Sequence, residues 1–258
     1  MCQAQDCPAI TVDIDAVAPI CFETGLPSFP LTATVAGGDG DGVFTWAGDG
    51  ITDAAAGTFS PVDAGVGPAA VTVSYREDGC DYVDDIVIQI FAIPTADFTA
   101  NAPICVTDST TVLYTGSGSD MATYNWDFDG GTAVPGTGPG PHRVIWDTDG
   151  DKTISLTVTE NGCTSEAFTQ TVMVAPELIA PMISCDVTSD SIIFTWPDVA
   201  GATGYTVTII DAPANAFATG GDPANTFIMA GFTPGQPATI AVTAISGTAC
   251  PDITFQGT

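Results

Sequence analysis

Eight cysteines are the residues of this chain whose type and spacing point most directly to chemistry. They stand at Cys2, Cys7, Cys21, Cys80, Cys105, Cys163, Cys185 and Cys250. None of them forms the tight Cys-x2-Cys pair typical of structural zinc sites. The last six, taken in order, make three pairs with separations of about 60 residues, which predicts three units, each closed by one disulfide: Cys21–Cys80, Cys105–Cys163 and Cys185–Cys250. Disulfides would indicate an oxidising compartment outside the cytoplasm, whereas the alternative is a set of buried free thiols.

The first two cysteines stand apart from this pattern. Cys2 and Cys7 could bridge across a short hairpin, or Cys7 could bond to a residue upstream. The stretch CPAIT from Cys7 matches CPDIT from Cys250, about 240 residues later. We therefore interpret residues 1–11 as the last strand of a preceding domain and the chain as a slice of a longer array. The alternative is that residues 1–17 form one long first strand.

Acidic residues at alternate positions offer the best candidate for metal binding. Asp147, Asp149 and Asp151 surround a Gly turn, an arrangement that suits the oxygen-rich coordination of calcium. The Glu that closes a twelve-residue calcium loop is missing, because Val158 stands there. Asp-Gly is also ordinary turn chemistry, so the alternative is a turn without metal. We expect the fold itself to need no cofactor and no bound metal.

Catalytic chemistry finds little support. His142 is the one histidine, and no Gly-x-Ser-x-Gly nucleophile motif accompanies it, so we expect it to be structural. The chain is therefore not expected to be an enzyme. Trp146 precedes the acidic turn and is a candidate for stacking on carbohydrate, while Trp46, Trp126 and Trp196 are expected in the cores.

The charge balance excludes several partners. Three Lys and Arg residues face 31 Asp and Glu, for a formal net charge of −28. Nucleic acid and anionic membranes both require a basic surface, so neither is expected to bind. No apolar run approaches the roughly 18–20 residues that span a bilayer. The first residues also lack the pattern of a secretory leader, so any export signal is expected outside this segment.

Alternating apolar residues identify the elements that hold these side chains. Val71, Val73 and Tyr75 fall on one face of a run that ends in Glu-Asp-Gly-Cys, and similar runs end at Cys163 and Cys250. Such alternation predicts half-buried strands, and Asp-Gly or Asn-Gly predicts hairpin turns. With 28 Gly and 19 Pro interrupting short strands and no helical periodicity, the fold class is all-β: tandem Ig-like β-sandwiches.

Longer stretches resemble known families. YNWDFDGG (124–131) followed by HRVIWDTDGDKTISLTVTENGC (142–163) resembles a PKD domain, although Asp129 and Gly130 stand where the family usually has Gly-Asp and Lys152 where it usually has Tyr. GVFTWAGDGI (42–51) looks like a divergent Ig-like relative, and SIIFTWPDVAGATGYTVTI (191–209) resembles fibronectin type III. The resemblance implies an Ig-like domain at 12–93, a PKD-like domain at 94–176 and a fibronectin type III-like domain at 177–258.

Such modules in acidic, lysine-poor arrays resemble the giant surface adhesins and extracellular filaments that gliding and predatory Bacteroidota export by type IX secretion. The resemblance implies a structural segment of an extracellular filament or adhesive stalk, with copies of itself and neighbouring repeats as partners. The uncharged loop GTAVPGTGPGP (131–141) is expected to reach a neighbouring chain. The alternative function is an accessory carbohydrate-binding or spacer module of a secreted polysaccharide-degrading enzyme.

Overall fold

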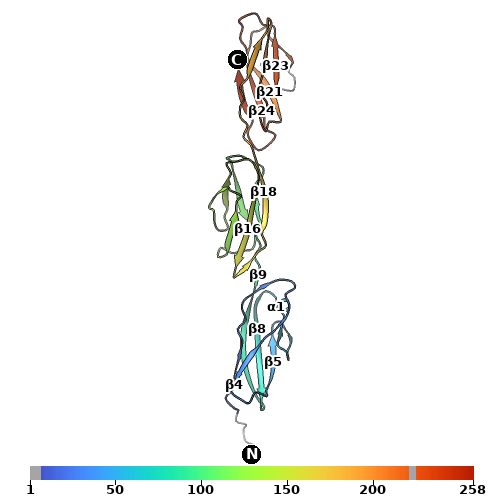
Figure 1. Ribbon diagram of the computed structural model, residues 1–258, viewed down its shortest axis with the longest axis vertical. Coiled ribbons are helices and arrows are strands. Elements are labelled where there is room, and N and C mark those ends of the chain that lie inside the picture. Colours follow the sequence, from blue (N-terminus) through green and yellow to red (C-terminus); the bar gives the residue numbers. More distant parts are fainter. Residues whose placement is uncertain (1–6, 221–224) are drawn as a thin grey trace, which may run out of the picture. The chain divides into compact units, whose positions relative to one another are not determined.

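The computed structural model describes residues 7–220 and 225–258. Apart from the four-residue helix α1 (Pro61–Ala64), all the elements in this part of the chain are strands (Figure 1). None of its helices is long and apolar enough to cross a membrane. The strands form three successive sets of sheets, which confirms the all-β prediction.

The first sandwich is built around a four-stranded sheet with the order β2-β9-β8-β5. A two-stranded pair, β1-β4, and a three-stranded sheet, β3-β7-β6, complete it. The bounds are β1 (Thr11–Ile14), β2 (Ile20–Phe22), β3 (Phe29–Pro30), β4 (Ala33–Ala36), β5 (Val43–Gly48), β6 (Ile51–Asp53), β7 (Thr58–Phe59), β8 (Gly67–Glu77) and β9 (Cys80–Ala92).

The second sandwich contains two sheets. One has the strand order β10-β12-β15-β14 and the other has the order β11-β18-β16-β13, with β17 also paired to β16. The bounds are β10 (Phe98–Ala100), β11 (Ile104–Cys105), β12 (Ser109–Tyr114), β13 (Thr123–Asp127), β14 (Thr132–Val134), β15 (His142–Ile145), β16 (Gly150–Glu160), β17 (Cys163–Thr164) and β18 (Phe168–Ala175).

The third sandwich has sheets of order β19-β20-β23-β22 and β21-β24-β25. The bounds are β19 (Ser184–Val187), β20 (Ser191–Thr195), β21 (Gly204–Asp211), β22 (Phe217–Gly220), β23 (Thr226–Ala230), β24 (Thr239–Ile245) and β25 (Ile253–Gly257).

The chain also forms two compact units that do not coincide with the sandwiches. One unit runs up to Ala96 and includes Gly116–Thr123 and Thr157–Glu166. The other contains Asp97–Thr115, Tyr124–Leu156 and Ala167–Thr258. The hairpin that carries Cys163 therefore packs with the first unit, although β16 itself belongs to the second sandwich.

The predicted alternation and turns are present. Val71, Val73 and Tyr75 of β8 are all buried, and the intervening side chains are more exposed. Asp78 and Gly79 both have positive φ, as do Asn161 and Gly162 after β16. Positive φ at both central residues is the requirement of a tight hairpin turn, so local chemistry sets these two corners.

The first described residues belong to the first sandwich and not to a preceding domain, so that interpretation of residues 1–11 is wrong for residues 7–11. Ile10, Val12 and Ile14 are buried in the core of this sandwich. β1 pairs antiparallel with β4, with Thr11 opposite Ala36. Apolar side chains at alternate positions from Ile10 onward give the segment one apolar face, and the core of the first sandwich buries it. Residues 1–6 lie outside the described part of the chain.

The tryptophans are mostly core residues. Trp46 and Trp196 are buried as expected, and Trp126 is half-buried against Phe98 and Phe128. Trp146, the candidate for stacking on carbohydrate, is only 2% exposed, and its Nε1 donates to the carbonyl of Phe128 at 2.8 Å. The prediction of carbohydrate stacking by Trp146 is therefore wrong, because the alternation His142, Val144, Trp146 continues the buried face of β15 by one residue.

The loop 131–141 is tied to its own sandwich. The carbonyl of Gly138 accepts from Trp126 Nε1 at 2.9 Å and lies 3.1 Å from His142 Nε2. The other ring nitrogen of His142 contacts the carbonyl of Pro135. These bonds do not favour the expected reach to a neighbouring chain, and they explain the fully buried His142 as a structural residue.

We expect Gly131→Ala to destabilise the second sandwich by about 1–3 kcal/mol, because a Cβ there would lie 2.7 Å from Trp146 Nε1 and 2.8 Å from Val144 Cγ1. Both neighbours are buried and cannot move aside. Chemical denaturation measures the change. The matched control is Gly136→Ala, where the nearest atom is the Ala133 carbonyl oxygen at 3.4 Å. Equal unfolding midpoints for the two variants would contradict the prediction.

Candidate functional site

Three disulfides connect the described cysteines, in a pairing that differs from the prediction. Cys7 bonds to Cys80, Cys21 to Cys163 and Cys105 to Cys250. Among the described cysteines Cys185 is free and exposed. The predicted pairs Cys21–Cys80, Cys105–Cys163, Cys185–Cys250 and Cys2–Cys7 are therefore wrong. Cys2 itself lies outside the described residues.

Strand register explains the error in the first sandwich. Cys21 of β2 lies opposite Phe91 of β9 in a parallel pair, whereas Cys80 begins the same strand β9. About 11 residues of extended chain separate these two levels, or roughly 35 Å. A disulfide requires Cα atoms within about 7 Å, so the two cysteines cannot bond.

The other two sandwiches repeat this geometry. Cys105 lies opposite Ala175, at the end of the second sandwich where Gly150 pairs with Val174. Cys163 pairs with Glu160, about 10 residues or roughly 33 Å further along β16. In the third sandwich, Cys185 Sγ lies 3.9 Å from the carbonyl oxygen of Thr258, beyond one end of β25, and Cys250 precedes the other end.

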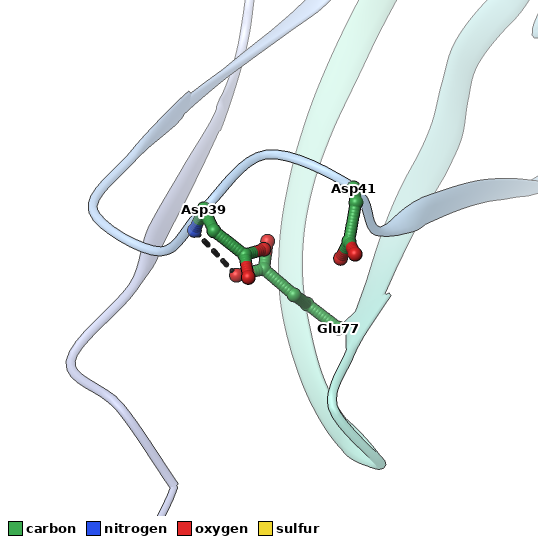
Figure 2. A group of neighbouring side chains, drawn as sticks. All are labelled: Asp39, Asp41 and Glu77. Atoms are coloured by element: carbon green, nitrogen blue, oxygen red, sulfur yellow. Dashed lines mark hydrogen bonds between the residues drawn. The ribbon is translucent and has the colours of Figure 1, made fainter.

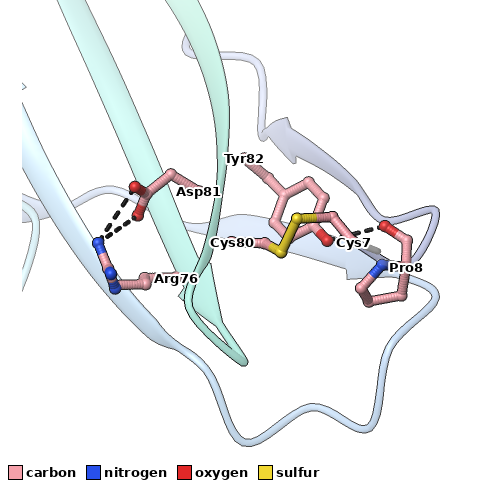
Figure 3. The surroundings of a disulfide bond; sticks show 6 residues. All are labelled: Cys7, Pro8, Arg76, Cys80, Asp81 and Tyr82. Atoms are coloured by element: carbon pink, nitrogen blue, oxygen red, sulfur yellow. Dashed lines mark hydrogen bonds and ion pairs between the residues drawn. A yellow bond between two sulfur atoms is a disulfide. The ribbon is translucent and has the colours of Figure 1, made fainter. Parts of the chain in front are cut away.

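The surroundings of Cys7–Cys80 show how the N-terminal segment is held (Figure 3). The Tyr82 hydroxyl donates to the carbonyl of Pro8 at 2.7 Å. On the same hairpin, Arg76 forms an ion pair with Asp81 at 3.1 Å, with both side chains more than half exposed. The disulfide and the Tyr82 hydrogen bond together hold Cys7 and Pro8 beside the β8–β9 turn.

Three carboxylates converge beside this turn. Asp39 and Asp41 come from the loop between β4 and β5, and Glu77 comes from the end of β8 (Figure 2). Each contributes an oxygen within 4.8 Å of the others, and no other described group of three acidic, Cys or His side chains does so. Asp147, Asp149 and Asp151, the predicted calcium ligands, are exposed and form no such group, so the calcium prediction for that turn finds no ligand set in the structure.

Glu77 is 2% exposed and its carboxylate is well supplied with hydrogen-bond donors. The Tyr75 hydroxyl donates to Oε2 at 2.5 Å, the Asp39 backbone N–H to Oε1 at 2.8 Å, and the Gly40 N–H to Oε2 at 3.3 Å. The Tyr75 oxygen in turn accepts from the Gly42 N–H at 2.9 Å. Tyr75 and Glu77 thus clamp the loop 37–42.

Hydrogen bonding shifts the acidities of this group. The hydrogen bond from Tyr75, followed by the Asp39 N–H, lowers the pKa of Glu77. The side-chain hydrogen bond between Asp39 and Glu77 raises the pKa of Asp39. The separate hydrogen bond between Tyr75 and Glu77 raises the pKa of Tyr75. Glu77 therefore carries the negative charge that the backbone donors stabilise, and Asp39 is the carboxyl that more readily keeps a proton.

Chemically, the cluster suits a loop clamp better than a metal site. Donors from the chain already occupy both oxygens of Glu77, so this carboxylate is less available to a cation. The sequence pattern did not predict that Glu77 lies beside Asp39 and Asp41. Its signal was available, because Glu77 continues the inward alternation Val73, Tyr75.

Comparisons with known proteins agree with this architecture. Residues 91–175 match the PKD domain family. No curated protein matches the chain.

Solved structures resemble the fold. An E-to-A mutated variant of a three-Ig segment of titin is 10% identical over 98% of both chains, with a TM-score of 0.57. A two-domain fibronectin type III segment of chicken tenascin is 15% identical, covers 64% of this chain and 98% of its own, and has a TM-score of 0.31. Three N-terminal domains of the bacteriophage RB49 outer capsid protein Hoc are 15% identical over 96% and 97%, with a TM-score of 0.38. The titin likeness shows the fold alone.

We expect Glu77→Gln to lower the unfolding midpoint at pH 7, with a difference that shrinks as the pH falls. Because folding lowers the pKa of Glu77, its stabilisation is complete above the unfolded value of about 4.5 and is lost as the pH falls through the folded value. Denaturation at several pH values from 7 to 3 measures it. The exposed Glu23→Gln is the control and should differ little at any pH. A Glu77→Gln difference that grows on acidification would contradict the clamp.

We expect removal of divalent cations by a chelator to leave the melting temperature unchanged, because the loop 37–42 is held by donors of the chain itself. Thermal unfolding with and without the chelator checks this. Asp39→Asn is the diagnostic variant, since Asp39 is exposed and its backbone N–H would still donate. A drop on chelation that Asp39→Asn abolishes would instead identify a metal site.

Proposed function

We propose that this chain is a structural segment of an extracellular filament or adhesive stalk that assembles with copies of itself. Tandem Ig-like and fibronectin-like domains with disulfides are typical of extracellular proteins, and such domains are generally non-catalytic. The observation that carries the proposal is the pairing of Cys21 with Cys163 and of Cys105 with Cys250. Each bond joins one sandwich to the next, which benefits a protein that spans distance more than one that binds a small ligand.

The composition supports an origin among type IX-secreted surface proteins of Bacteroidota. Three basic residues against 31 acidic ones match the acidic, lysine-poor arrays that the sequence resembles. The same acidic composition argues against nucleic acid as a partner, because such binding needs a basic surface.

The edges of the sheets support self-association. Arg76, Arg143 and Lys152 lie in β8, β15 and β16, and each of these strands has a neighbour on both sides. The edge strands thus lack lysine, the residue that most often blocks edge-to-edge pairing. The longest of them, β21, has eight residues and exposes Ile209 and Ile210. Only its last residue, Asp211, is charged.

The alternative, an accessory module of a polysaccharide-degrading enzyme, has weaker support. Its candidate for stacking on sugar, Trp146, is buried. An open cavity of about 390 Å³ in the third sandwich is lined by Asp198, Tyr205 and Asn225, among others. The Tyr205 hydroxyl there already accepts from the Val199 N–H at 2.7 Å. A spacer role remains compatible with the tandem sandwiches.

We expect the chain to form homo-oligomers as the salt concentration rises, because screening shortens the repulsion between highly acidic copies to about 3 Å at 1 M salt. Analytical ultracentrifugation from 0.05 to 1 M salt, with imaging of the products, measures assembly. Thr206→Lys places a lysine on edge strand β21 and should weaken assembly. Its control is Thr243→Lys, on the register partner in the central strand β24. A chain that stays monomeric at every salt concentration would overturn self-assembly.

A further inference from the structure

The three disulfides create a covalent route between the two ends of the chain that is much shorter than the polypeptide. From the N-terminus the route runs to Cys7, crosses to Cys80, continues to Cys105, crosses to Cys250 and reaches the C-terminus. It contains about 40 of the 258 residues. Residues 8–79 and 106–249 lie in closed loops beside this route.

We propose that tension applied to the two ends passes through residues 80–105 and is kept away from most of the sandwich cores. A taut chain cannot be longer than its shortest covalent route, and an extended residue spans at most about 3.6 Å. With its disulfides intact, the chain therefore cannot be drawn out beyond about 150 Å, whereas the reduced chain reaches about 900 Å. Reduction is thus the step that releases hidden length.

The segment that carries the tension is already extended in the folded protein. β9 (Cys80–Ala92) supplies half of it, and an antiparallel strand spans about 3.4 Å per residue, close to the maximum. β9 pairs with β8 from Cys80, opposite Glu77, to Ile90, opposite Gly67. β2 pairs with the other end of β9, from Ile90 to Ala92. Pulling therefore gains little length from β9 and loads its ladder hydrogen bonds together.

Cys21–Cys163 has a different role. This bond closes a loop of residues 22–162, which includes the segment from Cys80 to Cys105. The bond itself does not lie on the shortest covalent route between the two ends of the chain. Loss of this bond should leave the limiting length unchanged. Loss of Cys105–Cys250 leaves a shortest route through Cys21–Cys163 of about 120 residues, roughly three times longer. Loss of Cys7–Cys80 leaves a route of about 90 residues, roughly twice as long.

The test is single-molecule stretching of the full chain from its two ends in non-reducing buffer, after alkylation and non-reducing peptide mapping have established the pairing. The limiting length of the unmodified chain should be about 150 Å and should rise about sixfold on reduction. Cys105→Ser with Cys250→Ser should lengthen it about threefold, and the matched double variant Cys21→Ser with Cys163→Ser should not change it. Cys185→Ser, at the exposed free thiol, should also change nothing.

Disulfides within each sandwich would give a different set of results. The unmodified chain would then extend along about 80 residues, to roughly 280 Å, and both Cys185→Ser and the Cys21/Cys163 variant would lengthen it further. A limiting length of roughly 280 Å for the unmodified chain would overturn the proposal, and so would a longer limit for Cys185→Ser or for the Cys21/Cys163 variant. Measurements on the unmodified chain and on Cys185→Ser are enough to distinguish the two disulfide pairings. The test therefore still works if one of the double variants fails to fold. The limiting length depends on covalent connectivity alone, so a chain that fails to self-assemble would still show it.

Discussion

A disulfide joins two cysteines only when their Cα atoms lie within about 7 Å, while the long strands of an Ig-like sandwich hold their two ends several times farther apart. This mismatch governs the covalent structure of the chain. The early cysteine of each sandwich lies at one end of a sheet and the hairpin cysteine at the other. Cys21 and Cys105 therefore bond to hairpin cysteines of the following sandwich, and Cys80 bonds to Cys7. Each bond adds a constraint that the separate cores could not provide.

The few buried polar groups of the first two sandwiches hold surface loops in place. Glu77 accepts from Tyr75 and from two backbone N–H groups, and this clamps the loop between β4 and β5. His142 and Trp126 hold the loop after β14 in the same way. Buried polar groups need such partners, because an unsatisfied donor or acceptor costs about 1–3 kcal/mol.

Basic residues are distributed unevenly between the central and the edge strands of the sheets. The three basic side chains stand in central strands, so the sheet edges present neutral and acidic residues to solvent. At low ionic strength the net charge of −28 makes copies of the chain repel one another, and salt shortens the range of this repulsion. The edges carry no lysine that would block pairing at short range. In the self-association proposed above, pairing of these edges would therefore depend on the salt concentration of the medium. Covalent continuity along the chain is independent of that balance.

The sequence by itself determined the local structure. Alternation identified β8, β16 and β24, the Asp-Gly and Asn-Gly turns identified two hairpins, and the apolar faces identified most of the cores, because these signals depend on residues close together in the chain. Only the tertiary structure decided which cysteines meet and that Glu77 reaches Asp39 and Asp41. A separation of about 60 residues shows that two cysteines share a repeat, but only the pairing register shows at which end of a sheet each one lies. The end of the sheet at which a cysteine lies depends on pairing between strands that are distant in sequence, so it cannot be predicted from local patterns.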